Sequence, residues 1–567
     1  MHTLQSDTQR SLRLFASPFH ATRSWVLTRA GLLIAGVIAL TVGGAGLTDE
    51  GYGAAGGDMA RFLMNGVFIH DLFVDRPLAG WSQFLEYTQL YYARYPALSL
   101  GHHPVLLPLL EALSFAVFGI SVAAGRLVPL VSFIAAVVFL HELVRRRYGR
   151  AAAFAAATLF ATSPMVITFA RLVVAELLAI ALVLASAYYL TRFCETDRRA
   201  ALVGSAGAFA LSVYAKPQTV LIAPALLVLP LTAVPFQRLL RRDVMIAAVA
   251  TLVAALPALA VPLMVSYSNL HGAMGVAPPG STTRFGSLLW AALEPQLAWP
   301  VLTVAALAIA RAIVRRDSRS LIFLLWVACV TPALFFFGGI KGEVGRYTLY
   351  WVPALCGLAG SLLADWRNRV VPLMIAAALT VGAVMQASEM GRYSTHAGGY
   401  EEAAQFVLAA KPEATVLFSG DMDTGYFAFF VRKHDPARRL IVLRSDKVYT
   451  TSNMRAPSVE DRIQRPDQIY DALHKFGTRY VVIEDRASES RVLEWLRQEL
   501  KTPRFVERRR IPLRTTDPRL RGTSLAIYEL RDATPPDPDA VLSLHLPIVG
   551  QSLAVNLRDL IGRKLLR

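Results

Sequence analysis

The chain has 567 residues, of which 54% are apolar and 17% charged. A soluble globular protein carries nearer ~25% charged residues, so this composition excludes a purely soluble enzyme. The net charge of +17 comes from 58 Lys and Arg against 41 Asp and Glu. In a membrane protein such an excess usually lies in cytoplasmic loops, which argues against nucleic acid as a partner. Cys194, Cys329 and Cys356 lie far apart, which supports neither a disulfide framework nor a cysteine metal site.

Long apolar runs occupy most of the first 390 residues. A run of about 20 apolar residues spans a bilayer as a helix, because only a helix satisfies its own backbone hydrogen bonds in hydrocarbon. The first run, 25–47, follows a basic segment and precedes many more, so we interpret it as a retained anchor with a cytoplasmic N-terminus. Further runs lie near 121–143, 151–169, 172–193, 200–215, 218–236, 244–265, 297–313, 320–338, 347–364 and 370–388. The sequence therefore predicts a mainly α, polytopic membrane protein of about eleven transmembrane helices.

Arginine clusters indicate on which side of the membrane each connection between these helices lies. They fall in every second connection, as the positive-inside rule requires, at 145–150, 192–199, 238–242, 311–319 and 367–369. The register holds only if the apolar segment 104–118 does not cross, so we interpret it as a juxtamembrane or re-entrant helix. An odd number of spans places everything after about 389 on the outer face.

The outward parts of the chain are long. The first outer connection covers about 48–120, and from about 396 the composition becomes that of a soluble domain. Short β-rich runs (ATVLFSGD, RRLIVLRS, TRYVVIED, SLAIYELR) alternate with helical ones (YEEAAQFVLAAK, DQIYDALHKFG, RVLEWLRQELK). This alternation predicts a small α/β domain.

Four segments follow from this organisation. We expect a cytoplasmic N-terminus at 1–24, a transmembrane core at 25–388, an outer-face α/β domain at 389–534, and a linker with a basic amphipathic tail at 535–567. The tail, LRDLIGRKLLR, either contacts lipid headgroups or forms a solvated helix or strand.

Carboxylates gather where the first span emerges. Asp49 and Glu50 stand at its outer end, and Asp58 and Arg61 follow in a glycine-rich stretch. A carboxylate beside a low-dielectric wall can act as a general base or anchor a cation. The alternative is that these acids mark a solvated helix end. We predict Asp49 and Glu50 as catalytic residues and Asp58 as a substrate-binding residue.

Three basic residues, Arg171, Lys216 and Arg346, share the predicted outer edge, although the orientation bias disfavours cations there. Because a cation in hydrocarbon is costly, each should have a partner, and a membrane-bound phosphate would serve. Snorkelling to lipid headgroups is the alternative. Glu176, at the apolar start of a span, is a functional candidate or an ion-pair partner for Arg171. With Tyr347 these residues form the predicted substrate-binding set.

His102 and His103 form an adjacent pair before the non-crossing helix. Paired neutral imidazoles can bind a divalent metal ion, which is the one cofactor that the sequence suggests. No GxSxG, HExxH or Walker A sequence is present. Hydrolase and ATPase hypotheses therefore have neither a nucleophile nor a nucleotide cradle.

Several of these pieces together carry a family resemblance. They are LTDEGYGAAGGDMAR, YPALSLGHHPVLLPLLEALSFAVFGIS followed by GRLVPLVS, SPMVITFARLVVAELLAIAL, the AKP of Lys216, and GRYTLYWVPAL. In this order, over about residues 25–365, the chain resembles the polytopic glycosyltransferases of the C superfamily, specifically the protein-mannosyltransferase and aminoarabinose-transferase-like family. The domain after about 389 is outside the resemblance.

The resemblance implies an activity. Such enzymes move a sugar from a polyprenyl-phosphate carrier to a lipid, glycan or protein acceptor on the outer side of the bacterial plasma membrane. By resemblance, Asp49 takes the position of the catalytic acid, and Lys216, Arg171 and Arg346 hold the carrier phosphate. Direct displacement at the anomeric carbon would invert its configuration.

Two positions depart from the family pattern. His102 and His103 stand where aminoarabinose-transferase-like members commonly have an acidic and basic pair ahead of proline. Glu176 replaces the more usual aspartate and lengthens its reach.

Two rival hypotheses use the same features. A secondary transporter or lipid flippase also needs many spans and intramembrane charges, but the long first outer loop and the lack of a recognisable inverted repeat argue against it. A non-catalytic assembly protein would use the 396–530 region to bind a partner. Incorporation of a radiolabelled lipid-linked sugar by purified protein separates the transferase from both.

The arginine register predicts that residue 150 faces the cytoplasm and residue 420 faces outward. Single-cysteine variants, Arg150→Cys and Gly420→Cys, in a chain without its native cysteines, test this in intact cells. An impermeant maleimide should label position 420 and leave position 150 unlabelled. Labelling at 150 but not at 420 would invert the topology.

Overall fold

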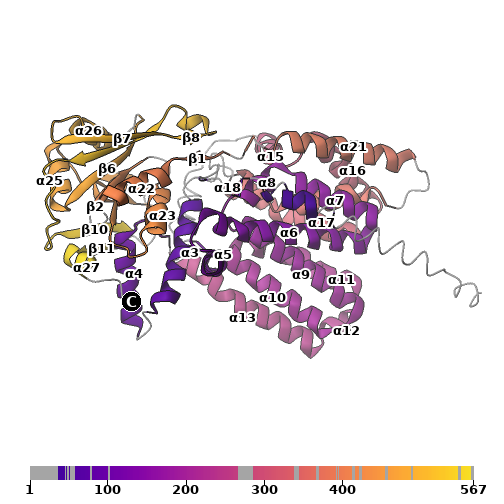
Figure 1. Ribbon diagram of the computed structural model, residues 1–567. Helices are drawn as coiled ribbons and strands as arrows, with labels where there is room; N and C mark the ends of the chain where they lie inside the picture. Colours follow the sequence, from indigo (N-terminus) through magenta and orange to yellow (C-terminus); the bar gives the residue numbers. More distant parts are fainter. Residues whose placement is uncertain are drawn as a thin grey trace, which may run out of the picture.

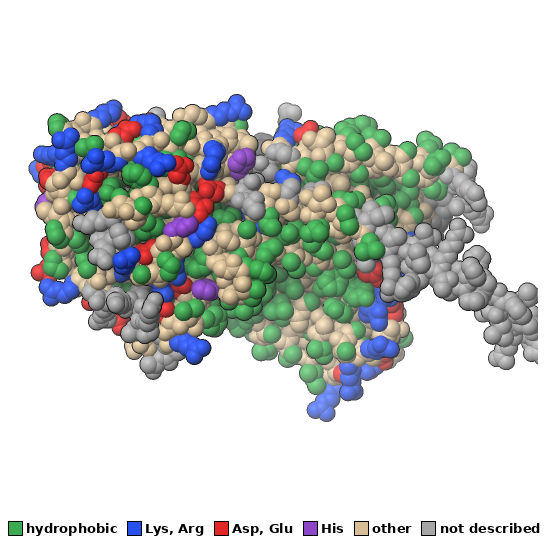
Figure 2. All heavy atoms as spheres, viewed as in Figure 1, with side chains coloured by type: hydrophobic (Ala, Val, Ile, Leu, Met, Phe, Trp, Pro, Cys, Tyr) green, Lys and Arg blue, Asp and Glu red, His purple; other side chains and the backbone are tan. Residues whose placement is uncertain are grey.

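The computed structural model describes most of the chain. The described residues are 33, 36–41, 43, 44, 46, 47, 50, 58–76, 80–99, 103–265, 285–337, 344–364, 370–390, 392, 393, 395–410, 415–420, 424–453, 458–486, 490–546 and 551–562. A helical body and an α/β part lie side by side, with the helices of the first outer loop between them (Figure 1). Charged side chains gather over the α/β part, whereas apolar side chains cover the helical body (Figure 2).

Apolar helices build the helical body. They are α6 (Val122–Tyr148), α7 (Arg150–Thr162), α8 (Pro164–Arg171), α9 (Glu176–Thr196), α10 (Arg199–Ala215), η1 (Pro217–Ile222), α11 (Ala223–Ala233), α12 (Phe236–Leu239), α13 (Arg242–Val265), α15 (Phe285–Leu293), α16 (Trp299–Val314), η2 (Ser318–Ser320), α17 (Leu321–Val330), α18 (Pro332–Phe337), α19 (Val344–Thr348), α20 (Trp351–Ser361) and α21 (Val370–Ser388). Every run predicted to span, apart from 25–47, overlaps one of these helices or two to three consecutive ones. The run 25–47 lies largely outside the described residues.

The lengths of these helices identify a multi-pass membrane protein. Within the described residues, α6, α9, α13 and α21 are long and apolar enough to cross a bilayer, and α7 with α8, bent by 60°, forms either a broken span or a re-entrant loop. Six further apolar helical stretches among the described residues have 10 to 17 residues. The predicted polytopic, mainly α fold is confirmed, while the count of eleven spans stays a prediction.

Two prolines interrupt helices of the helical body near the candidate site described below. Proline lacks a backbone N–H and disfavours the helical conformation of the residue before it. Accordingly α7 ends before Ser163-Pro164, and α10 ends at Ala215, so that the next residue, Lys216, is extended (φ −157°) ahead of Pro217. These breaks leave polar side chains at the ends of apolar helices.

The described residues of the first outer loop form the helices α3 (Asp58–Asp75), α4 (Trp81–Arg94) and α5 (Leu106–Phe118). Helix α5 packs against α3 and α6. Its 13 residues give a length of about 20 Å at ~1.5 Å per residue. This is less than the ~30 Å of bilayer hydrocarbon, in keeping with a helix that does not cross.

The α/β part is built around a five-stranded sheet with the order β3-β2-β6-β9-β7. Strand β2 (Thr415–Ser419) pairs parallel with β3 (Ile441–Arg444) and β6 (Thr478–Glu484), while β9 (Ser524–Leu530) pairs antiparallel with β6 and β7 (Phe505–Pro512). The remaining elements are β1 (Ala397–Gly398), β4 (Thr450–Asn453), β5 (Ser458–Asp461), β8 (Arg514–Thr515), η3 (Pro518–Leu520), α22 (Tyr400–Ala410), α23 (Thr424–His434), α24 (Ser445–Val448), α25 (Asp467–Lys475) and α26 (Arg491–Leu500). The predicted small α/β domain is thus confirmed.

The C-terminal segment differs from the tail expected from the sequence. Strands β10 (Val541–Leu546) and β11 (Gln551–Asn556) form a hairpin, and α27 (Leu557–Gly562) packs against α4. Leu544, Leu557 and Leu560 are at most 1% exposed and join the core beneath the sheet. The described residues after the PPDPD segment therefore belong to the packed α/β part.

A buried ion-pair cluster joins the first outer loop to the α/β part. Asp71 of α3 accepts two hydrogen bonds from Arg432 of α23, at 2.7 and 2.6 Å, and a third from the Tyr91 hydroxyl at 2.7 Å. One turn away, Arg438 binds Asp75. Burial opposes ionisation of Asp71, but His70 and the two guanidinium groups outweigh it and hold the pKa of Asp71 far below its usual range.

We expect Asp71→Asn to destabilise the protein, because removing one member of a buried ion pair leaves uncompensated charge at a cost of about 3–5 kcal/mol. The variant should unfold at a lower temperature than wild type in a detergent thermal melt. Arg510→Gln is the control, since Arg510 forms partly exposed pairs with Glu507 at 2.8 Å and with Asp485, and surface pairs contribute ~0–1 kcal/mol each. Equal melting temperatures for both variants would show that the cluster does not join the two parts.

Candidate active site

A buried ion-pair network lies where the spans of the helical body meet the first outer loop. Glu176, which is fully buried, accepts hydrogen bonds from Lys216 Nζ and Arg346 Nε through the same oxygen, Oε1. Arg346 Nη1 also donates to Asp58 Oδ2 at 2.7 Å. Arg346 therefore bridges two carboxylates, and the structure brings four predicted site residues into one cluster.

Each member stands at a break in regular structure. Glu176 begins α9, and Asp58 lies in the first turn of α3, where the positive end of the helix dipole favours a carboxylate. Lys216 occupies the extended residue between α10 and η1, and Arg346 lies on the short helix α19. The charges thus collect at helix ends, while the helix interiors remain apolar.

His103 and Arg61 complete the surroundings of Asp58. His103 Nε2 and Arg61 Nη1 each lie 3.5 Å from Asp58 Oδ1, and the His103 ring lies 4.3 Å from that of Phe62. Burial opposes ionisation of Asp58, but His103 and the charges of Arg346 and Arg61 outweigh it and hold the pKa of Asp58 well below its usual range. Burial lowers the pKa of His103 despite the nearby carboxylate. At neutral pH Asp58 is therefore an anion and His103 is neutral.

The cluster carries an excess of positive charge. Its three cations, Lys216, Arg346 and Arg61, face two carboxylates. Lys216 Nζ also lies 5.6 Å from the centre of the Tyr347 ring, a cation–π geometry that brings another predicted residue to the site. The arrangement suits a ligand that carries one negative charge.

Glu176 also offers an unused acceptor. Within the described part of the chain, its Oε2 is buried and has no hydrogen-bond partner. Buried carboxylate oxygens are normally paired, so a donor such as a ligand hydroxyl or a water is expected beside this atom.

The other predicted residues lie elsewhere or outside the described chain. Arg171 ends α8 and is half-buried, five residues before Glu176. Asp49 and His102 lie outside the described residues. Among those described, no three His, Cys, Asp or Glu side chains are grouped as metal ligands would be. The predicted metal site, which depends on His102 as well as His103, stays a prediction.

Among the described residues, those that the Glu50 carboxylate contacts belong to the α/β part. Its carboxylate accepts a hydrogen bond from the Gly399 N–H at 2.9 Å and lies 3.6 Å from Arg514. Burial raises the pKa of Glu50, the Gly399 N–H opposes this, and the neighbouring Glu401 adds to it. The structure thus binds Glu50, which the sequence predicts as catalytic, to the backbone of the α/β part.

Arg61 is the network member that the sequence analysis did not place in the site. Its separation of three residues from Asp58 puts both side chains on one face of α3. This spacing of three residues is the feature of the sequence from which a place for Arg61 beside Asp58 could have been predicted.

Comparisons with known proteins support a common fold. Residues 102–264, which include His103, Glu176 and Lys216, match the family model described as dolichyl-phosphate-mannose-protein mannosyltransferase. No curated protein sequence matches the chain.

Solved structures extend the likeness over most of the chain. ArnT from Cupriavidus metallidurans bound to undecaprenyl phosphate has a TM-score of 0.54 at 13% identity, over 89% of this chain and 99% of that one. Its apo state gives 0.51 at 14% identity, over 91% and 100%. The apo oligosaccharyltransferase of Archaeoglobus fulgidus gives 0.50 at 13% identity, over 81% and 69%. The resemblance inferred from the sequence is confirmed at the level of the fold.

Proposed function

We propose that this membrane protein, which has the fold of the C-superfamily membrane glycosyltransferases, moves a sugar from a polyprenyl-phosphate carrier to an acceptor on the outer face of the membrane. The observation that carries the proposal is the buried network in which Arg346 links Glu176 to Asp58. A cluster with surplus positive charge at the ends of spans suits a ligand whose phosphate lies at the membrane surface and whose tail lies in lipid.

The cations bind the donor phosphate. A polyprenyl-phosphate sugar is a phosphodiester with one negative charge, which the unbalanced positive charge of the network would neutralise. When the bond between the anomeric carbon and the phosphate oxygen breaks, the departing polyprenyl phosphate gains a second charge. Lys216 and Arg346 stabilise that developing charge, and preorganised cations in a water-poor site are effective in this role. The undecaprenyl phosphate bound to the ArnT structure supports this class of carrier.

Glu176 orients the sugar. Its Oε1 is occupied by Lys216 and Arg346, and its buried Oε2 is open to a donor. A sugar hydroxyl bound there would hold the anomeric carbon at a fixed place relative to the phosphate. Fixed placement of reacting groups lowers the entropic part of the barrier.

Asp49 acts as the general base. The acceptor hydroxyl attacks the anomeric carbon, its proton passes to Asp49, and the polyprenyl phosphate leaves from the opposite side, so the configuration inverts. Asp58 is unsuited to this task, since its ion pairs hold its pKa well below its usual range, and a carboxylate of such low basicity is a weak proton acceptor.

The acceptor approaches from the side of the α/β part. In a bacterium the enzyme would lie in the plasma membrane with this part in the periplasm, where lipids, glycans and proteins are available as acceptors. The α/β part, fixed by Arg432 and Arg438 to the first outer loop, would help to recognise the acceptor.

Lys216→Ala should weaken donor use about ten- to a hundredfold, the cost of one lost charge-assisted contact. Arg346→Ala should do the same. The measurement is the dependence of sugar transfer on donor concentration. Because each cation also pairs with buried Glu176, a thermal melt of each variant separates loss of folding from loss of donor binding. The phosphate assignment is wrong if both Ala variants are folded and retain wild-type donor KM and turnover.

Asp49→Asn should lower the transfer rate by about 10²–10⁴-fold, because it removes the basic oxygen while keeping the side-chain shape. Folding should be unaffected, and Asp467→Asn, an exposed substitution on α25, is the matched control. Transfer of a radiolabelled sugar from the carrier by purified protein measures the effect. If chelation abolished wild-type activity and a divalent ion restored it, Asp49 would be a metal ligand instead. A variant that transfers sugar at nearly the wild-type rate contradicts both roles.

A further inference from the structure

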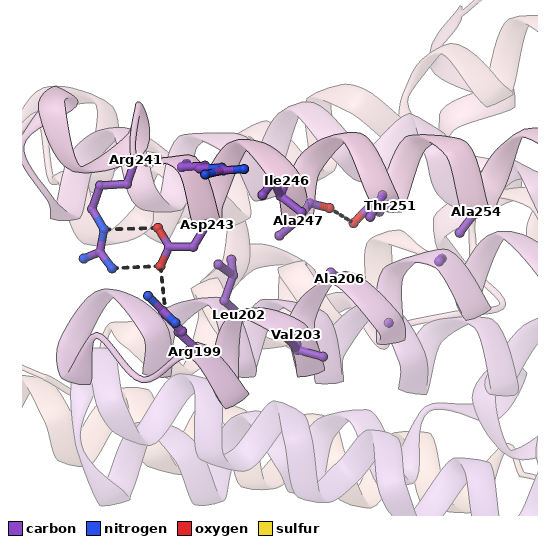
Figure 3. A pocket seen from close by; sticks show the side chains of 14 residues that line it. Arg199, Leu202, Val203, Ala206, Arg241, Asp243, Ile246, Ala247, Thr251 and Ala254 are labelled. Atoms are coloured by element: carbon purple, nitrogen blue, oxygen red, sulfur yellow. Dashed lines mark hydrogen bonds and ion pairs between the residues drawn. The ribbon is translucent and has the colours of Figure 1, made fainter.

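A groove of about 730 Å³ lies between α10 and α13 in the helical body (Figure 3). Small side chains of the two helices form its floor, chiefly Ala206, Gly207 and Ala210 on α10 and Ala247, Ala250 and Ala254 on α13. A Cβ built on Gly207 would meet no atom within 4 Å, so the space above this residue is open. The groove is therefore a narrow apolar channel along the helices.

The groove opens toward the outside of the helical body. Helix α13 packs chiefly against α10, and only 6% of its apolar window is buried. Large side chains of α13, such as Leu252 and Val253, are about 60% exposed. In a membrane-spanning helix such a face contacts hydrocarbon, so lipid chains have direct access to the groove.

Arginines line one end of the groove. Figure 3 shows Arg199, Arg241 and Asp243 together at that end, whereas Ala254 lies at the other. Arg241 is committed to its neighbours, since it donates to both oxygens of Asp243 at 3.1 and 2.8 Å and to Asp197 at 2.7 Å. Arg241 is therefore a fixed part of the groove wall.

Arg199 and Arg242 keep donors available for a ligand. The Arg199 side chain is 80% exposed and has a long contact of 3.6 Å to Asp243. Arg242 is exposed and, within the described residues, has no ion pair. Three arginines face one carboxylate among the residues that line the groove. This end carries surplus positive charge.

An apolar channel that ends in surplus positive charge is complementary to an amphiphile with an anionic head and a hydrocarbon chain. We propose that the groove binds one anionic glycerophospholipid, with its phosphate between Arg199 and Arg242 and an acyl chain along Gly207 and Ala250. A zwitterionic lipid brings no net charge to the arginines, and a free phosphate leaves the apolar channel empty.

The lipid site is separate from the donor site. Lys216 follows the last residue of α10, and Arg199 is the first, so the helix of 17 residues divides them. At ~1.5 Å per residue this separation is about 25 Å. The lipid would occupy the leaflet at the arginine end of the spans, opposite the phosphate that Lys216 and Arg346 bind.

Native mass spectrometry of the purified chain tests the proposal. With equal added concentrations of phosphatidylglycerol, phosphatidylethanolamine and undecaprenyl phosphate, one phosphatidylglycerol per chain should bind at least about tenfold more tightly than either other lipid. Arg242→Gln and Arg199→Gln should each weaken binding about fivefold, the effect of one basic residue near an anionic lipid. Gly207→Leu should block the channel and abolish the bound species.

Matched controls lie outside the groove. Arg150→Gln removes an exposed arginine at the start of α7, and Ala377→Leu introduces the same leucine side chain at an exposed position of α21; both should bind lipid as wild type does. The proposal would be overturned if all three lipids bound equally or if undecaprenyl phosphate were preferred. It would also be overturned if Arg242→Gln and Gly207→Leu left lipid binding unchanged, or if the controls lost lipid binding equally. So would occupation of the groove by a second copy of the chain, seen as a dimer that Gly207→Leu dissociates.

Discussion

The contact of Arg346 with both Glu176 and Asp58 is the interaction on which the arrangement of the site depends. A buried charge is tolerated when it is paired, and loss of one partner costs about 3–5 kcal/mol. The partners here come from the first outer loop, from the start of α9 and from α19, so none of these segments is free to move without exposing an unpaired charge. Lys216 adds the break between α10 and η1 to the same cluster. A network that is required for stability thereby also sets the geometry of a site.

Helix α3 extends this constraint to the α/β part. Its first residue, Asp58, belongs to the buried network, and its last turns present Asp71 and Asp75 to Arg432 and Arg438. The two ends of one rigid helix of 18 residues, about 27 Å long, are thus bound by ion pairs to different parts of the protein. The α/β part is therefore held at a defined place relative to the network, which a role in acceptor recognition requires.

Much of this architecture is predictable from the sequence. Hydropathy determines which segments become apolar helices, and the predicted β-rich runs correspond to β2, β3, β6 and β9. The missed strand β7 carries Glu and three Arg in succession. It lies at the sheet edge, where exposed charges are tolerated and protect the edge from pairing.

The charged residues of the site could each be recognised from the sequence, because they are ions in apolar surroundings. Their pairing could not, since Arg346 is separated by 170 residues from Glu176 and by 288 from Asp58. Sequence proximity suggested Arg171 as the partner of Glu176, whereas the structure shows Lys216 and Arg346, both distant in sequence, bound to the Glu176 carboxylate.

The same electrostatics divides the acidic residues of the first outer loop into different chemical classes. A carboxylate that accepts from Arg346 and lies beside His103 is held as an anion, which makes Asp58 a good anchor for cations and a poor proton acceptor. Glu50 is in the opposite position, because burial raises its pKa while its carboxylate is bound to the backbone of Gly399. Proton transfer to an acceptor hydroxyl needs a carboxylate that is neither neutralised by cations nor committed to another part of the fold. This requirement argues against Asp58 and Glu50, and it is the reason for proposing Asp49, the other acid that the sequence places at the outer end of the first span, as the base.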